Sequence, residues 1–305
     1  MEPLLDFSFL ERRLGDMSRR RSVALACPHD SHTEYVIERA LKEGFARFVL
    51  TVTGPLSARL SAAVEAAEGL VSIVKCADAV EASREAVAAV RRGEAEVLMK
   101  GTVNTDVLLR AVLDKQCGLL EPGHVMNHIT VSHIPAYGKL LMFSDAAVVP
   151  RPSLEQFDAI VGACASACRK LGIGTPHIAL THCTEKVNPK FEHTIHYEEI
   201  KHRAAAGAYG SVVVDGPMDV KTALDAGSGA IKGISSPVAG KADVLIFPNI
   251  EAGNTFYKTI TLFSGAQTAG WLAGTTVPVV VASRADSEES KYYSLVMAVT
   301  QSREY

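Results

Sequence analysis

The order of apolar runs along the chain constrains its fold more than any other feature. Several runs of strand length are apolar at successive positions, which is typical of strands covered on both faces. Stretches rich in alanine, glutamate and arginine separate most of them and favour helix. This alternation predicts a doubly wound α/β architecture with a parallel sheet. The runs that we interpret as strands span residues 22–27, 47–52, 70–75, 96–101, 128–134, 139–145, 177–182, 211–216, 242–248 and 277–283.

One segment departs from this alternation. HITVSHIPAYGKLLMFSD, residues 128–145, contains two strand-length runs joined by a short turn with proline and glycine, and it predicts an antiparallel hairpin. Within an α/β chain such a hairpin indicates a mixed sheet and the start of a second domain near residue 120, where Gly118, Pro122 and Gly123 favour a loop. Two abutting domains would leave a cleft between them, where ligands commonly bind.

Charge and composition disfavour several classes of protein. The 305 residues carry a formal net charge of −3, which gives no electrostatic reason to bind nucleic acid or an anionic membrane. No apolar run reaches the ~18 residues of a membrane span, and the first residues lack the apolar core of a signal peptide. The six cysteines form no CxxC pair, as suits free thiols in a reducing cytoplasm. We therefore expect a cytoplasmic protein without nucleic-acid or membrane partners.

The end of the fourth run carries groups that bind phosphate. Lys100 and Gly101 are followed by a turn and by a helix that starts near Asn104. Ligands of open α/β sheets bind beyond the carboxyl ends of strands, and the free N–H groups of a helix start attract anions. Together with Arg110, one to two turns into the helix, these groups form a candidate phosphate site, although the GxxxxGK[ST] pattern is absent. The alternative is an ordinary helix cap, for which the chain offers Thr102, Asn104 and Thr105.

A second strand end carries polar side chains near residue 250. After the run 242–248 the chain turns into a helix, and Gly253 allows a close backbone approach or a positive φ. The structural alternative is turn chemistry with Asn254 as the helix N-cap. The polar groups that we assign to a possible ligand site here are Asn249, Glu251 and Asn254.

Other polar residues are weaker candidates. Asp145 and Asp215 each follow a strand, where acids often serve as caps, and of the two we favour Asp145 as a site residue. His193 and His196 are three residues apart on a predicted helix, but no HExxH pattern or matching acid accompanies them. We predict no metal site.

Taken together and in this order, these segments resemble the phosphate acetyl/butyryl transferase family. The resemblance spans roughly residues 96–287, and the first hundred residues match only in general character. VNTDVLLR, DGPMDVKTALD, PNIEAGNTFYK and SRADS look more like the butyryl branch than the acetyl branch. The segments that carry it are LMKGTVNTDVLLRAVL, HIPAYGKLLMFSDAAVVPRPSLEQ, VVVDGPMDVKTALD, KGISSPVAGKADVLIFPNIEAGNTFYK and PVVVASRADS.

The resemblance implies reversible transfer of an acyl group from acyl-CoA to inorganic phosphate, which yields an acyl phosphate and free CoA. Coenzyme A and phosphate would be substrates, with no permanently bound cofactor. It also implies two α/β domains, similar in architecture to isocitrate and isopropylmalate dehydrogenases, with the active site in the cleft. Residues 1–120 with 270–305 would form the first domain. Residues 121–269 would form the second, through which a homodimer would assemble.

Individual roles also follow from the resemblance. The family's serine–arginine pair falls on Ser283 and Arg284, and its arginine after the strand–turn–helix falls on Arg110. The two arginines would contact phosphate or the phosphates of CoA. Ser283 would donate a hydrogen bond rather than act as a nucleophile, because no histidine is placed to activate it. An aspartate of the acetyl branch, proposed there as a base, falls on Ser290, so that role does not transfer.

Three alternatives stay open. A phosphate acetyltransferase would differ in acyl-chain preference, which depends on pocket volume. A metal-dependent decarboxylating dehydrogenase of similar fold would need metal-binding aspartates and a nicotinamide loop, and the sequence shows neither. A non-catalytic protein that binds CoA or phosphate would fit the absence of the base at Ser290.

Overall fold

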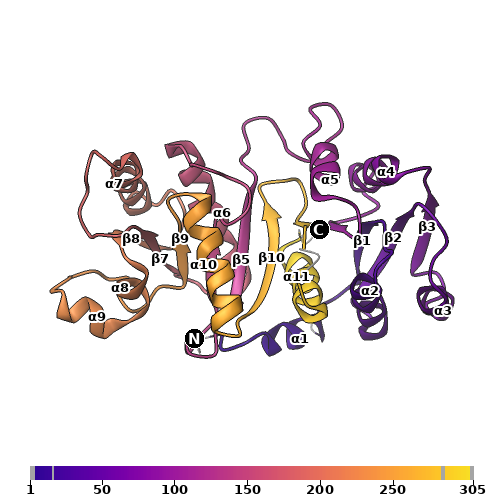
Figure 1. The fold of residues 1–305 in the computed structure, drawn as a ribbon, viewed down its shortest axis with the longest axis horizontal. Coiled ribbons are helices and arrows are strands. Elements are labelled where there is room, and N and C mark those ends of the chain that lie inside the picture. Colours follow the sequence, from indigo (N-terminus) through magenta and orange to yellow (C-terminus); the bar gives the residue numbers. More distant parts are fainter. Residues whose placement is uncertain (1–3, 16, 283–285, 303–305) are drawn as a thin grey trace. The chain divides into compact units, whose positions relative to one another are not determined.

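The computed structural model describes residues 4–15, 17–282 and 286–302. The chain divides into two compact units, and each is a layer of strands covered by helices (Figure 1). We name them the terminal unit, Phe7–His124 with Ala269–Tyr305, and the central unit, Val125–Thr268 with Met1–Asp6.

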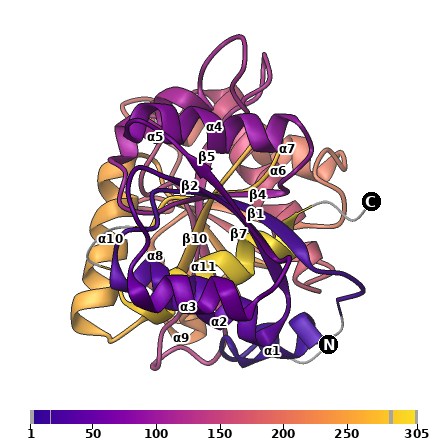
Figure 2. The ribbon, with the colours of Figure 1, turned by 90° about the vertical axis from the view of Figure 1, so that its right-hand side faces the viewer.

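The terminal unit is a doubly wound sheet. Its strands are parallel except β10, which runs antiparallel to β11. Helices α4 (Ala79–Arg91) and α5 (Thr105–Val112) cover one face, and α2 (Ser31–Glu43), α3 (Ala58–Ala66) and α11 (Glu288–Gln301) cover the other (Figures 1 and 2). The short helix α1 (Ser8–Gly15) packs against α11. The strand order is β3 (Val71–Lys75), β2 (Ala46–Val52), β1 (Arg21–Ala26), β4 (Val97–Lys100), β11 (Val279–Val280) and β10 (Gln267–Ala273).

Local sequence explains why β1 lies inside this sheet and how α2 follows it. All six residues of β1 are buried, as its apolar run requires of a strand with neighbours on both sides and helices on both faces. The carboxylate of Asp30 then caps α2 by accepting a hydrogen bond from the Thr33 backbone N–H. The helix ends at Gly44, whose φ of 78° is the left-handed conformation that glycine adopts most easily.

The central unit contains the predicted hairpin. Strands β5 and β6 are antiparallel, with Val131 opposite Met142, and the other neighbouring pairs are parallel. Helices α6 (Leu154–Lys170) and α7 (Glu192–Ala205) pack beside each other, while α9 (Ala226–Ile231) packs on α8 (Val220–Leu224). The strand order is β5 (Asn127–His133), β6 (Leu141–Ser144), β9 (Val244–Ile246), β7 (His177–Thr181) and β8 (Val213–Met218).

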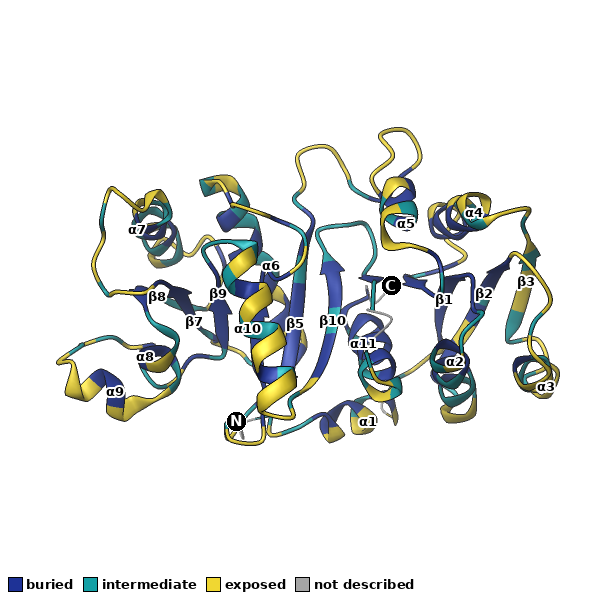
Figure 3. Cartoon of the chain, in the orientation of Figure 1, coloured by how far each residue is buried: buried dark blue, intermediate teal, exposed yellow. Residues whose placement is uncertain are grey.

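Strand β6 shows how the core of the central unit is divided between two faces. Leu141 and Phe143 join the apolar cluster beneath α10 (Ile250–Phe263), where the Phe143 and Phe256 rings meet edge to face at 5.3 Å. Met142 points to the opposite face, where its sulfur lies 3.8 Å from the Cys168 thiol of α6. All four residues of β6 are buried, and Figure 3 shows its neighbour β5 as largely buried too. A strand buried on both faces is mostly apolar, as Leu141, Met142 and Phe143 are before Ser144 in this run.

The predicted α/β architecture and the hairpin are confirmed, and each predicted strand is present, although the last one is shortened to Val279–Val280. Strand β10, of sequence QTAGWLA, was not predicted. None of the helices in the part of the chain that the structure describes is long and apolar enough to span a membrane.

Candidate active site

The carboxyl ends of β1, β4 and β11 lie at one edge of the terminal sheet. Ala26 is paired with Lys100, and Val280 is paired with Met99, so the residues that follow these strands emerge side by side. Neighbouring parallel strands bring such loops together in open α/β sheets, and ligands bind there. Ser283 and Arg284 follow β11 closely in the sequence, but both lie outside the described residues.

Gly101 is needed because two backbones approach closely at this edge. Its N–H donates to the Ala26 carbonyl at 2.8 Å, and a Cβ atom on residue 101 would lie 2.1 Å from the Cys27 carbonyl oxygen. The Cys27 carbonyl oxygen also accepts hydrogen bonds from the backbone N–H of Thr102, at 2.8 Å, and from its hydroxyl, at 3.0 Å. The close approach at Gly101, which the sequence did not predict, has a specific partner, the left-handed residue Cys27 after the end of β1.

The ammonium of Lys100 is buried beside this turn. Its Nζ donates to the carbonyl oxygens of Gly101, at 3.0 Å, and Val103, at 3.3 Å. The side chain thus holds the loop between β4 and α5 in shape while its positive charge stays within the strand-end region. A charged group placed in this way favours an anion near the loop.

The start of α5 is less capped than the sequence led us to expect. Asn104 occupies the N-cap position, but its side chain does not cap the helix. Only its backbone carbonyl contributes, by accepting hydrogen bonds from Val107 and Leu108. The alternative in which the Asn104 side chain caps the helix is therefore wrong, because Val107 and Leu108 bond to its backbone carbonyl and its side chain makes no capping hydrogen bond. The first N–H groups of α5 are left without that side-chain cap, which is the condition for anion binding at a helix start.

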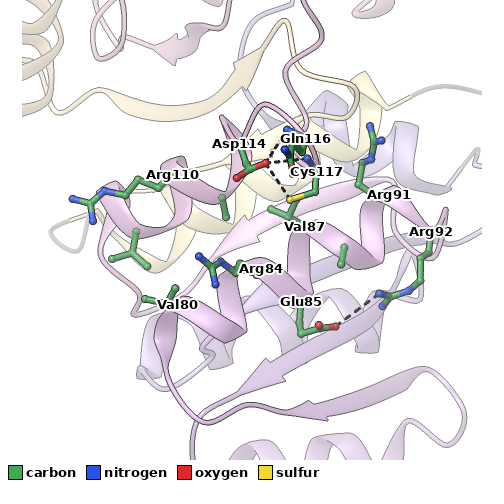
Figure 4. Close-up of a pocket in the computed structure, with 13 residues that line it drawn as sticks. Val80, Arg84, Glu85, Val87, Arg91, Arg92, Arg110, Asp114, Gln116 and Cys117 are labelled. Atoms are coloured by element: carbon green, nitrogen blue, oxygen red, sulfur yellow. Dashed lines mark hydrogen bonds and ion pairs between the residues drawn. The ribbon is translucent and has the colours of Figure 1, made fainter.

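Arg110 lies farther along α5, with an exposed side chain. Its guanidinium forms an ion pair with Asp106 one turn earlier, at 3.2 Å. It also lines a groove between α4 and α5 (Figure 4). The assignment of Arg110 to phosphate or CoA stays a prediction.

Two contacts that the prediction missed join the loop after β1 to residues that follow Ser283 and Arg284 in the sequence. The carboxylate of Asp30 lies 3.3 Å from the buried ammonium of Lys291 in α11, and the His32 ring lies 3.2 Å from the Asp286 carbonyl. Burial acts to raise the pKa of Asp30, but hydrogen bonds from Thr33 and the charge of Lys291 outweigh it and lower that pKa. The turn CPHD after β1 is a strand end like the others, and the same reasoning applied there would have found these residues.

The cap of α11 is a serine. Ser287 caps the helix by accepting a hydrogen bond from the Ser290 N–H. Glu288 and Glu289 lie in the first turn, where their charges favour the helix dipole. Ser290, the position of the missing base, therefore belongs to the capping turn.

In the central unit, Asp145 serves the backbone. Its buried carboxylate accepts hydrogen bonds from the N–H groups of His128, Ala147 and Val148, at 2.7–2.8 Å. Its carbonyl oxygen is the atom that a Cβ on Gly253 would meet, at 2.1 Å. Asp145 thus holds β5, β6 and α10 in register, which is the capping role that a strand-end acid often has.

Of the polar residues around position 250, two bond to the backbone and one is exposed to solvent. Asn249 is the N-cap of α10, since its side chain accepts from the Ala252 N–H at 2.9 Å. Asn254, the cap in the structural alternative, instead donates its amide to the Ala146 carbonyl at 3.0 Å. That expectation for Asn254 is wrong because the helix begins one turn earlier. Glu251 is exposed in the first turn.

A pair of histidines in the central unit is joined by a hydrogen bond. The His193 Nε2 and His182 Nδ1 atoms are 3.0 Å apart. Burial, followed by the neighbouring His182 and His196, lowers the pKa of His193 to about 4, and burial also lowers the pKa of His182. Within residues 4–15, 17–282 and 286–302, no three His, Cys, Asp or Glu side chains gather closely enough to hold a metal ion.

Comparison with known proteins places this geometry in a family. The family described as phosphate acetyl/butaryl transferase matches residues 56–299. A probable phosphate butyryltransferase of Bacillus subtilis is 35% identical over 291 residues, which cover 95% of this chain and 96% of the relative. A phosphate acetyltransferase of Thermotoga maritima is also 35% identical, covering 95% and 98%.

A solved structure agrees with these relatives. The crystal structure of a branched-chain phosphotransacylase from Enterococcus faecalis is 32% identical to the chain, with a TM-score of 0.80, and covers 92% of this chain and 98% of that one. The chain therefore belongs to the phosphate acetyl/butyryl transferase family. Its reaction class is the transfer of an acyl group between a thioester and phosphate.

Proposed function

We propose that the chain transfers a short-chain acyl group of the butyryl type between CoA and inorganic phosphate. The observation that carries this preference is the similarity, over nearly the whole chain, to the Bacillus subtilis probable phosphate butyryltransferase and to the branched-chain phosphotransacylase of Enterococcus faecalis. Phosphate acetyl transfer is the second candidate, because the Thermotoga maritima phosphate acetyltransferase is equally similar.

The proposed reaction is a direct displacement. A phosphate oxygen attacks the thioester carbonyl carbon and forms a C–O bond, the carbonyl oxygen becomes an oxyanion, and the C–S bond then breaks. The products are the acyl phosphate and CoA thiolate, which takes up a proton. Such a step needs cations that hold phosphate and donors that stabilise the oxyanion.

We assign these tasks to the strand-end residues of the terminal unit. The buried charge of Lys100 and the start of α5, with Gly101, Thr102, Asn104 and Thr105, would attract phosphate. Arg284 and Arg110 would contact phosphate or the phosphates of CoA, and Ser283 would donate to the oxyanion. No acid stands at position 290, so cations near the sulfur, rather than a dedicated base, would favour the thiolate.

The residues of the central unit have a different part in this proposal. Glu251 and Asn254 offer exposed polar groups for CoA. Asp145, Asn249 and Gly253 are more important for the shape of the turn than for direct contact, since each is held by the backbone. The placement of the site in a cleft, the homodimer and the cytoplasmic location stay predictions.

One assay tests the proposal. The purified protein is incubated with acetyl-, propionyl-, butyryl- or isobutyryl-CoA, with and without phosphate, and thiol release is followed with a chromogenic disulfide. We expect release only with phosphate, and the highest kcat/KM with butyryl- or isobutyryl-CoA. A preference for acetyl-CoA would favour the second candidate. The absence of release with every thioester would favour a non-catalytic CoA-binding protein.

A further inference from the structure

A groove runs between α4 and α5 on the terminal unit. Helix α4 contributes Val80, Arg84, Val87 and Arg91, whose spacing of four, three and four residues places them along one face of the helix. Helix α5 contributes Val107 and the residues one turn later. The groove encloses about 550 Å³, which lies within the range of small-molecule sites.

The base of the groove is apolar. Val87 is buried, while Val80 leaves 44% of its surface exposed at the N-terminal end of α4. Ala88 and Ala111 are small, and they leave room between the two helices. An apolar floor of this size, open to solvent, suits the flat ring system of a ligand.

Two arginines on the rim have no close ion-pair partner among the described residues. Arg84 and Arg91 form no hydrogen bond or ion pair with the part of the chain that the structure describes. By contrast, Arg92 lies 2.8 Å from Glu94, and Arg110 is paired with Asp106. A separation of seven helical residues places the Arg84 and Arg91 backbones about 10 Å apart. The two guanidinium groups therefore offer anion contacts along the length of the groove.

Two acids line the groove beside these arginines, and both have partners: Glu85 lies 3.8 Å from Arg92, and Asp114 is held by the loop after α5. One oxygen of Asp114 accepts hydrogen bonds from the N–H groups of Gln116 and Cys117, at 2.9 and 3.0 Å, and from the Cys117 thiol, at 3.2 Å. These bonds hold the carboxylate toward the loop after α5. Cys117 is exposed and lines the groove above Val87 (Figure 4), so its thiol reports on the occupancy of this site.

We infer that the groove between α4 and α5 binds a nucleoside phosphate, with the base on the apolar floor and the phosphates at Arg84 and Arg91. Guanidinium groups pair with phosphate through two parallel N–H donors and also stack on flat rings, so both parts of such a ligand are matched. The same chemistry is present in a free nucleotide and in the nucleotide end of CoA. The second source rests on the proposed function, whereas the first is independent of it.

The test uses ADP as the probe and the alkylation of Cys117 by iodoacetamide as the readout. Mass spectrometry of the native protein follows Cys117 and the other exposed thiol, Cys183, in one sample. We expect saturating ADP to slow alkylation of Cys117 at least fivefold and to leave Cys183 unchanged. Adenosine and pyrophosphate, each used alone, should protect much less because each fills only half of the site.

Variants separate the groove from other anion sites. We expect Arg84→Ala with Arg91→Ala to weaken ADP binding, measured by calorimetry, by about a hundredfold, at about tenfold for each charge-assisted contact. Arg12→Ala removes an exposed arginine of α1 that does not line the groove, and it should leave ADP binding unchanged. Unchanged circular dichroism would show that the double variant folds.

The two sources are distinguished by acetyl-CoA, tested without phosphate. If ADP protects Cys117 and acetyl-CoA does not, and the double variant keeps its transferase kinetics, the ligand is a free nucleotide. Protection by acetyl-CoA, with a raised KM for acyl-CoA in that variant, identifies the nucleotide end of CoA. Overturning results would be no protection and no heat of binding with either compound, protection that survives in the double variant, or equal protection by pyrophosphate.

Discussion

The Cα of Gly101 faces the backbone carbonyl of Cys27 so closely that a Cβ atom would lie 2.1 Å from its oxygen. This approach joins the ends of β4 and β1, and the hydrogen bonds of Gly101 and Thr102 to β1 depend on it. The turn that carries Lys100 is therefore fixed by a contact that only glycine permits.

Gly101→Ala is expected to destabilise the protein by about 1–3 kcal/mol, because the backbones must separate to admit the methyl group. The displaced turn should also lower kcat/KM at least tenfold. Urea unfolding and the thiol-release assay measure the two effects. Gly54→Ala is the control, since a Cβ at that position meets nothing within 4 Å. Wild-type stability and activity in Gly101→Ala would show that the turn tolerates the extra atom.

Lys100→Met keeps the apolar stem of the side chain and removes its charge. We expect the KM for phosphate to rise and kcat/KM to fall by about tenfold or more, as for the loss of one charge-assisted contact. The carbonyls of Gly101 and Val103 lose a donor, so thermal unfolding must be measured beside the kinetics. Lys42→Met, at an exposed position in the last turn of α2, serves as control. An unchanged KM for phosphate would remove Lys100 from the site.

Ser283→Ala and Arg284→Ala should each lower kcat/KM at least tenfold without changing the melting temperature. The loss of an oxyanion donor costs roughly 2.7–4 kcal/mol, and the loss of a charge-assisted bond about 1.5–3 kcal/mol. Arg284→Lys keeps the charge but not the two parallel donors, and it should recover only part of the activity. Both alanine variants with near-wild-type kinetics would refute these assignments.

The lowered pKa of His193 should make the free energy of unfolding depend on pH. The pKa of His193 is lowered to about 4, below the ordinary value of about 6.5, so between these values the unfolded chain binds a proton that the folded chain does not. Stability should therefore fall as the pH drops from about 6.5 to 4. We expect a loss of about 2 kcal/mol, less than the full shift implies because the ring is partly exposed.

Urea titrations at pH 7 and pH 4.5 measure this loss. His193→Gln removes the titrating group and should make the pH dependence shallower. His202→Gln changes an exposed histidine on the same helix and should not. Equal slopes for wild type and His193→Gln would show that another group governs acid unfolding.

The sequence pattern was sufficient for strands built on a run of successive apolar residues, such as β1 and β6, because burial on both faces favours that composition. It was insufficient for β10, QTAGWLA, which begins with two polar residues and is interrupted by Gly270. The start of α10 was also misplaced: the structural alternative put its N-cap at Asn254, whereas the observed N-cap is Asn249. Several polar residues compete for each cap, and the three-dimensional path of the chain decides between them.

The candidate site was predictable where one strand end supplies several residues, as around Lys100. The close contact of Gly101 with Cys27 and the pairing of Asp30 with Lys291 were not, because each joins segments far apart in the chain. The groove between α4 and α5 was missed for the same reason, since its residues come from two helices that look like ordinary amphipathic elements.

The place of β11 in the sheet affects how the protein is made on the ribosome. In the sheet β4 lies between β1, which precedes it in the chain, and β11, which is encoded about 180 residues later. We therefore expect one edge of β4 to lack its strand partner while the central unit is being synthesised. An unpaired strand edge is a template for pairing with another chain, so the nascent protein should be most prone to aggregation before β11 has been made.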